Sequence, residues 1–345
     1  MKRLTALVYA VLTAFSEAED RAASEDILVL ENQAQPHKSP AWGLVFSPDS
    51  KYIAAGAGND DSLGSWGVVN LFEVKSMKVI QSLKGYKSEV RAIAFSRDGK
   101  TIAAGGYPLI VWEVASGKKL HKLKPPSTLI SLIYISDQNR MITTSRGERA
   151  TIVWDTKEGK RVTTLDGDSE AGIVASLDIT KDDNLLATGG DGRYATVWDC
   201  KTWEVQKTVN GSASRVESEL VRFGSADSVL FAKGDFRTPG KIWRINDGAL
   251  KCQLERDRHP TYDARFSPDG HLLAQASSSF ADKKFEGLQL WNAETGKLLH
   301  SVSGHFTSVA FSPDGRLLAT GSNKGMISLY RLNNPLPQVK STNPK

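Results

Sequence analysis

The sequence predicts an all-β protein built from seven copies of one small sheet. Three observations predict this fold class. A block of the form Phe-Ser-Pro-Asp-Gly recurs along the chain, a second landmark with a central aromatic residue follows each copy, and successive copies lie 40 to 49 residues apart. A fixed period of this size is the signature of a repeat architecture, in which each repeat is one supersecondary unit. We therefore expect the repeats to fill most of the 345 residues.

The first landmark marks the end of the first strand in each repeat. Its last apolar residue precedes Ser-Pro-Asp-Gly or a variant, and the seven copies of that residue are Phe46, Phe95, Ile135, Ile179, Phe223, Phe266 and Phe311. Pro presets φ in this element and Gly accepts a positive φ, so we expect a tight turn. A short apolar second strand ending in small residues follows, as in Ile-Ala-Ala-Gly at residues 53–56.

The second landmark indicates the third strand. Its central aromatic residue is Phe72, Trp112, Trp154, Trp198, Trp243, Trp291 or Tyr330 in the seven copies. We expect these rings to pack between sheets rather than to bind a ligand. A turn such as Ala-Ser-Gly-Lys at residues 115–118 and a short fourth strand come next. Short apolar strands separated by Gly, Asp and Asn turns are typical of all-β folds.

The repeats are expected to close into a ring. One four-stranded sheet cannot bury both of its faces alone, so each sheet must stack against its neighbours. The last repeat ends at Leu332 without a fourth strand, and an unmatched apolar run, Ile-Leu-Val-Leu at residues 27–30, precedes the first repeat. We predict that this N-terminal run completes the last blade, since an open sheet edge would invite aggregation.

At these landmarks the sequence resembles the WD40-repeat family, whose period is about 40–45 residues. The resemblance covers residues 27–332 and implies a seven-bladed β-propeller that serves as an interaction scaffold. The Trp-Asp pair survives only at residues 154–155 and 198–199, and the Gly-His pair only at residues 304–305. The family's buried Asp–His–Ser–Trp hydrogen-bond network is therefore expected to be mostly absent. The stability of the blades is then expected to depend more on apolar packing. Strong Phe-Ser-Pro-Asp-Gly blocks behind a signal resemble bacterial members of the family.

The first 18 residues differ from the repeats. Lys2 and Arg3 precede a 12-residue apolar run, and small residues then flank a cleavage site after Ala18. This layout is typical of a secretory signal, and the run is shorter than the roughly 20 residues that span a bilayer. We predict a signal peptide (1–18), a linker (19–26), the propeller (27–332) and a polar tail (333–345). The protein is then exported, periplasmic or secreted, without stable membrane insertion; an uncleaved anchor and a cytoplasmic location are the alternatives.

Composition and motifs argue against several function classes. The net charge of +5 is spread along the chain without a basic stripe, so we expect no nucleic-acid binding. The six histidines lack metal-ligand spacing, and neither a nucleophile elbow nor a phosphate-binding Gly-rich loop before a helix is present. We predict no catalytic residue, no metal and no cofactor. Cys200 and Cys252 are expected to stay unpaired, with a disulfide as the alternative.

Three long connections between second and third strands carry the candidate binding residues. In this architecture they share a face with the connections between blades, and those of blades 1, 5 and 6 cluster on one side of the ring. Aromatic and arginine side chains are typical of binding hot spots. The candidate partner-binding residues are Trp66, Phe236, Phe280, Phe285, Arg149 and Arg193. The alternatives are aromatics that cover the blade rims and arginines in surface salt bridges.

The leading hypothesis is a monomeric, non-enzymatic scaffold. It binds a protein or peptide partner on the face that carries the long connections of blades 1, 5 and 6. The alternative is a propeller enzyme or small-ligand binder that acts through the central channel. Polar residues converging in the channel around a metal would favour the alternative.

Overall fold

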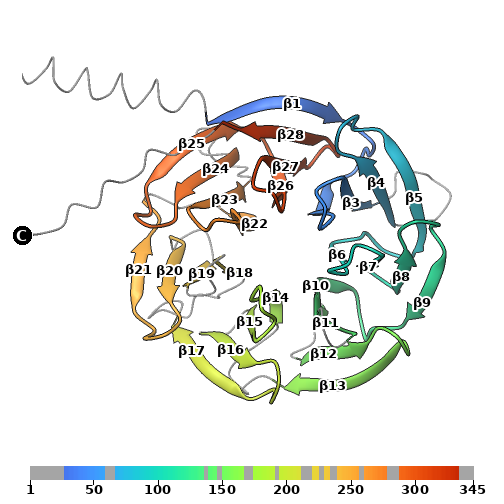
Figure 1. Ribbon diagram of the computed structural model, residues 1–345, viewed down its shortest axis with the longest axis horizontal. Helices are drawn as coiled ribbons and strands as arrows, with labels where there is room; N and C mark the ends of the chain where they lie inside the picture. Colours follow the sequence, from blue (N-terminus) through green and yellow to red (C-terminus); the bar gives the residue numbers. More distant parts are fainter. Residues whose placement is uncertain are drawn as a thin grey trace, which may run out of the picture.

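The structure is a computed structural model that describes residues 27–58, 67–135, 139–145, 150–166, 174–190, 194–210, 220–224, 229–233, 239–255, 260–277 and 287–333. These residues form 28 strands and no helix. The strands make seven four-stranded antiparallel sheets, which are arranged as a ring (Figure 1). The seven-bladed β-propeller predicted from the sequence is confirmed.

In blades 1 to 6 the four strands follow one another in chain order from the centre of the ring to its outer edge. Blade 1 contains β2 (Ala41–Phe46), β3 (Tyr52–Gly58), β4 (Gly67–Glu73) and β5 (Val79–Tyr86). Blade 2 contains β6 (Ala92–Phe95), β7 (Thr101–Gly105), β8 (Leu109–Glu113) and β9 (Lys119–Leu123). Blade 3 contains β10 (Leu129–Ile135), β11 (Arg140–Ser145), β12 (Ala150–Asp155) and β13 (Lys160–Asp166). Blade 4 contains β14 (Val174–Ile179), β15 (Leu185–Gly190), β16 (Tyr194–Asp199) and β17 (Val205–Asn210).

The remaining blades follow the same plan, except for the outer strand of the last. Blade 5 contains β18 (Leu220–Phe223), β19 (Val229–Lys233), β20 (Lys241–Arg244) and β21 (Leu250–Gln253). Blade 6 contains β22 (Thr261–Phe266), β23 (Leu272–Ser277), β24 (Gly287–Asn292) and β25 (Leu298–Ser303). Blade 7 contains β26 (Phe306–Phe311), β27 (Leu317–Ser322), β28 (Ile327–Leu332) and, as its outer strand, β1 (Leu28–Ala34).

The N-terminal strand lies in the slot where the sequence analysis expected it. β1 pairs antiparallel with β28, from Leu28 opposite Leu332 to Ala34 opposite Ile327 (Figure 1). The strand extends beyond the apolar run, because residues 32–34 continue the ladder after an irregularity at residue 31. The two ends of the ring are thus held by backbone hydrogen bonds within one sheet.

The hydrophobic core is divided into seven clusters, one between each pair of neighbouring blades. Between blades 7 and 1, for example, Phe72 and Phe46 pack with Leu329 and Ile327. The cluster between blades 5 and 6 packs Phe231 against Trp291. Because the cluster between blades 7 and 1 is as apolar as the other six, the ring is closed by side-chain packing as well as by β1.

The third-strand tryptophans combine packing with a hydrogen bond. Those of blades 2, 3, 4 and 6 are 1–6% exposed, which agrees with the predicted packing between blades. Each also donates its indole N–H to a side chain, which lies in the same blade for blades 3, 4 and 6 and in the outer strand of blade 1 for the tryptophan of blade 2. The pairs are Trp112–Tyr86 (2.9 Å), Trp154–Thr143 (2.8 Å), Trp198–Thr188 (2.9 Å) and Trp291–Gln275 (2.8 Å). A single bond therefore satisfies the buried indole donor in these four blades.

The Ser-Pro-Asp-Gly turns join the first and second strands as predicted. In blade 1 the hydroxyl of Ser47 donates to the carboxylate of Asp49 at 2.6 Å, and that carboxylate accepts the N–H of Lys51 at 3.1 Å. These bonds, led by the one from Ser47, hold the pKa of Asp49 below its usual 3.8. The fourth turn position has a positive φ, which Gly supplies in blades 2, 6 and 7 and Ser50 in blade 1.

Candidate binding site at the mouth of the central channel

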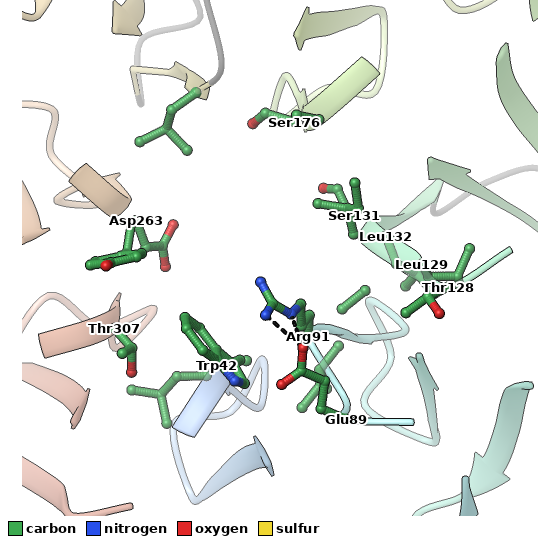
Figure 2. Close-up of a pocket in the computed structure, with 18 of the residues that line it drawn as sticks. Trp42, Glu89, Arg91, Thr128, Leu129, Ser131, Leu132, Ser176, Asp263 and Thr307 are labelled. Carbon is green, nitrogen blue, oxygen red and sulfur yellow. Dashed lines mark hydrogen bonds and ion pairs between the residues drawn. The ribbon is translucent and has the colours of Figure 1, made fainter. Parts of the chain in front are cut away.

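A cavity of about 510 Å³ opens where the inner strands begin. All seven blades contribute to its lining, and most of the lining residues lie at the start of an inner strand or just before it. Figure 2 shows side chains from blades on opposite sides of the ring converging on one open space. The start of an inner strand lies beside the connection between a second and a third strand. The segment that leads into β6 shows this, because the N–H of Val90 donates to the carbonyl of Ala57 and the N–H of Lys87 donates to the carbonyl of Tyr107. The two kinds of connection thus share a face, as expected.

A cluster of three aromatic and cationic side chains stands at this mouth. Trp42 and Tyr262 are the second residues of β2 and β22, and their rings meet edge to face with centroids 6.0 Å apart. The guanidinium carbon of Arg91 lies 4.2 Å from the centroid of the Trp42 ring. Such a cation–π contact stabilises by about 0.5–2 kcal/mol, depending on its exposure. Tyr262 remains 40% exposed, so part of the cluster is open to a partner.

Glu89 orients the arginine of this cluster. One of its carboxylate oxygens accepts bonds from Nε of Arg91 at 2.7 Å and from Nη2 at 2.5 Å. Both residues belong to the connection between blades 1 and 2, and each side chain is about one third exposed. Figure 2 shows the guanidinium of Arg91 pointing into the cavity, with Glu89 on one side and Trp42 on the other. The arginine is therefore positioned by two neighbours while its outer edge faces the open space.

A second charged group lies deeper, between blades 4, 5 and 6. The guanidinium of Arg222 donates to Asp263 at 2.7 Å, to Ser176 at 2.7 Å and to the carbonyl of Ala264 at 2.9 Å. Arg222 and Asp263 are only 8% and 11% exposed in their side chains. On the other side Asp178, which is partly buried, accepts the backbone N–H of Phe223, next to Arg222. Three blades are thus linked by one buried arginine.

Burial dominates the electrostatics of this network. It raises the pKa of both Asp178 and Asp263 above the usual 3.8, while the positive charge of Arg222 opposes that rise. Removing charges from water is costly, and a buried pair repays the cost only when the geometry is good and the remaining donors are bonded. The donors of Arg222 meet this condition through carbonyl and hydroxyl acceptors.

The long connections begin and end at the same face as the cavity. The register pairs that place them are Ala41–Ala57 and Gly58–Gly67 in blade 1, Leu220–Lys233 in blade 5, and Thr261–Ser277 in blade 6. Gly58–Gly67 joins the end of a second strand to the start of a third strand, and the other pairs join the start of an inner strand to the end of a second strand. The connection that follows the second strand therefore leaves the blade at this face. The six predicted residues themselves, Trp66, Phe236, Phe280, Phe285, Arg149 and Arg193, lie outside the described residues.

Two repeat positions carry the functional residues that the sequence analysis missed. Trp42, Arg91 and Tyr262 each stand four residues before the first-strand landmark of their repeat. Asp178 and Arg222 stand one residue before it, where other blades have residues such as Val45. A comparison of equivalent positions across the seven copies would therefore have found both the mouth and the buried charges.

The described residues contain no group of three or more His, Cys, Asp or Glu side chains that could hold a metal ion. Cys200 and Cys252 do not form a disulfide. In the described part of the chain, no helix is long and apolar enough to cross a membrane.

The repeats match a known family. The profile described as "WD domain, G-beta repeat" matches residues 30–66, 77–107, 159–199 and 296–331. Each match begins at or next to the outer strand of one blade and continues into the next blade, so the sequence repeat is offset from the structural blade by one strand. The first match begins in β1, the outer strand of blade 7, which agrees with the observed closure.

Three relatives illustrate the similarity. The guanine nucleotide-binding protein subunit beta of Zea mays is 22% identical over 317 residues, covering 86% of this chain and 70% of the maize protein. The serine-threonine kinase receptor-associated protein of Gallus gallus is 24% identical over 259 residues, covering 73% and 69%. Apoptotic protease-activating factor 1 of Rattus norvegicus is 24% identical over 300 residues, covering 83% of this chain but only 22% of the rat protein. All three are eukaryotic, so the bacterial character stays a prediction without support from them.

Proposed function

We propose that this seven-bladed β-propeller of WD40 repeats is a non-enzymatic scaffold that binds a protein or peptide partner at the mouth of its central channel. The observation that carries the proposal is the cluster of Trp42, Arg91 and Tyr262 at that mouth. Tryptophan, tyrosine and arginine are the residue types most enriched in binding hot spots. Here Trp42 contacts both Arg91 and Tyr262, and all three side chains line the cavity and are partly exposed.

The surroundings of the cluster support the same use. The second strands of blades 1, 5 and 6, from which the long connections follow, end at this face. The ring beneath is held by apolar clusters between the blades, so Trp42 and Tyr262 stand on packed inner strands, and Arg91 directly precedes β6. A pre-organised site loses little conformational entropy on binding.

The relatives point to the same class of function. One is named as a subunit of a larger assembly and another as a protein associated with a kinase receptor. Both names describe association with other proteins, and the present chain covers about 70% of each of these two relatives. We extend only this general property, the binding of protein partners, to the present chain.

Photo-crosslinking in the cells of origin tests the proposal. The full chain is produced with benzoylphenylalanine in place of Tyr262, and in separate controls in place of Lys51, on the opposite face, or Leu298, on an outer strand. We expect covalent protein adducts from position 262 and few or none from the controls. Adducts confined to the controls, or no adduct at position 262, would contradict the proposed face.

We also propose that the protein is exported. The support is the charged start, apolar run and small-residue cleavage site within residues 1–18. Amino-terminal sequencing of the protein purified from its native cells tests this. A mature chain that begins at Glu19 is expected, and an intact Met1 would contradict cleavage.

A further inference from the structure

The arginine at the channel mouth, Arg91, has N–H donors that bond to no acceptor among the described residues. Arg91 uses Nε and Nη2 for Glu89 and one ring face for Trp42. Its Nη1 has no hydrogen-bond partner among the described residues, and the guanidinium is directed into the cavity (Figure 2). Two planar N–H groups on one edge of a guanidinium are the geometry that binds both oxygens of a carboxylate.

Arg265 offers a second set of donors from the opposite side of the ring. It lines the same cavity and is 38% exposed. Its link to Asp263 is long, at 3.5 Å, because the same carboxylate oxygen already accepts Arg222 at 2.7 Å. Its other contact, from Nη1 to the carbonyl of Ala264, is 3.4 Å long. Within the described residues, Nε and Nη2 of Arg265 donate to no acceptor, so these donors are available to a ligand.

Each acidic group of the site already holds an arginine. Oε1 of Glu89 accepts both contacts from Arg91, and Oδ1 of Asp263 accepts Arg222 as well as the backbone N–H of Ala264 at 3.0 Å. Arg91 also stacks on one face of the Trp42 ring. A positively charged ligand would therefore compete with arginines that these carboxylates already bind, whereas a negatively charged one would find unused donors.

Resting on the proposed function, we infer that the partner inserts a carboxylate-bearing side chain, Asp or Glu, into the channel mouth. Arg91 binds that carboxylate through its outer edge, and Arg265 supplies a second cationic contact. Trp42 and Tyr262 pack against the apolar part of the same segment. The free N–H donors, rather than a net positive charge, would hold the carboxylate. The charged residues that line the cavity sum to a small positive charge, which Asp178 behind Arg222 offsets.

Selection from a random peptide library tests the inference on the full chain. Displayed 12-residue peptides are enriched on the immobilised protein, and the most enriched sequence is synthesised with a fluorescent label. A second version carries Asn or Gln in place of each Asp or Glu. Fluorescence anisotropy should show that the amide version binds about tenfold more weakly, the effect of losing one charge-assisted pair.

Arginine variants assign that loss to the site. Arg91→Lys keeps the charge but loses the planar fork, so it should weaken the acidic peptide about tenfold and leave the amide version unchanged. Arg265→Lys should act in the same direction. Arg316→Lys is the matched control, because Arg316 lies on an exposed turn at the opposite end of blade 7. Unchanged melting temperatures confirm that the variants remain folded.

The outcomes separate this inference from the proposed function. No enrichment, enriched peptides without acidic residues, equal affinity of acidic and amide versions, or an unchanged affinity in Arg91→Lys would each overturn carboxylate recognition. If a neutral peptide binds and Tyr262→Ala abolishes its binding, the proposed face stands and only the inference falls. If Tyr262→Ala has no effect either, both fall.

Discussion

Asp263→Ala removes the carboxylate that receives the buried guanidinium of Arg222. Both side chains are about nine-tenths buried, and they join blades 5 and 6 at 2.7 Å. The remaining partners of Arg222 are a hydroxyl and backbone carbonyls, which do not neutralise its charge. Loss of one member of a buried pair costs about 3–5 kcal/mol, because the other charge stays buried without its counter-charge. Asp178 still faces Arg222, so we expect the lower end of that range.

For a chain of this size, about 3 kcal/mol lowers the melting temperature by about 5 °C. Differential scanning calorimetry at neutral pH measures the change. Asp247→Ala is the matched control, since Asp247 pairs with Arg244 at 2.9 Å while both side chains are about half exposed. Such a solvent-exposed pair contributes little to stability, because water and salt screen its charges. An equal fall in the two variants would refute the reasoning. The double variant Arg222→Met with Asp263→Leu should regain part of the loss, because no buried guanidinium remains without Asp263 and Asp178 keeps the backbone N–H of Phe223 as a donor.

Three further changes have defined outcomes. Thr143→Val leaves the buried indole N–H of Trp154 without an acceptor and should cost about 1–3 kcal/mol in urea unfolding, an effect that should vanish in a Trp154→Phe background. Hydrogen bonds lower the pKa of Asp49 and Asp98 below 3.8, so these carboxylates contribute stability above pH 3.8 that is lost as the pH falls through their lowered pKa. With Asn at both positions, the free energy of unfolding should therefore decrease less steeply between neutral and acidic pH. Deletion of residues 1–34 removes β1 and should yield aggregates in size-exclusion chromatography, whereas deletion of residues 1–26 should not.

Much of the fold can be predicted from the sequence because the repeat shows itself seven times. A turn that needs Pro and Gly, a second strand of small apolar residues and a buried aromatic residue each leave a visible mark. The hydrogen bonds of the buried tryptophans are less visible, because their acceptors differ between blades. Thr143, Thr188 and Gln275 share one position of the second strand but differ in residue type, and Tyr86 comes from the outer strand of the preceding blade. No single motif therefore indicates them.

The candidate site was harder to predict because it is made by departures from the repeat. Trp42 and Tyr262 lie 220 residues apart and meet only because the ring brings blades 1 and 6 to one mouth. Arg222 and Asp178 replace apolar residues at one repeat position in neighbouring blades, where Arg222 binds Asp263 and Asp178 accepts the N–H of Phe223. Exposed aromatic residues in long connections are one sign of a binding hot spot, and the prediction rested on them. Trp42 and Tyr262 instead lie on the inner strands, where an aromatic residue is equally compatible with packing in the core.

Hydrogen–deuterium exchange of the full chain, with and without the partner recovered by crosslinking, tests the central claim most directly. If the partner binds at the channel mouth, exchange should slow in peptides that cover residues 87–92 and 260–265, at the start of β6 and β22. Peptides that cover residues 47–51 and 312–316, the turns on the opposite face, should exchange at unchanged rates. Protection confined to those turns or to the outer strands, with none at the mouth, would contradict the account.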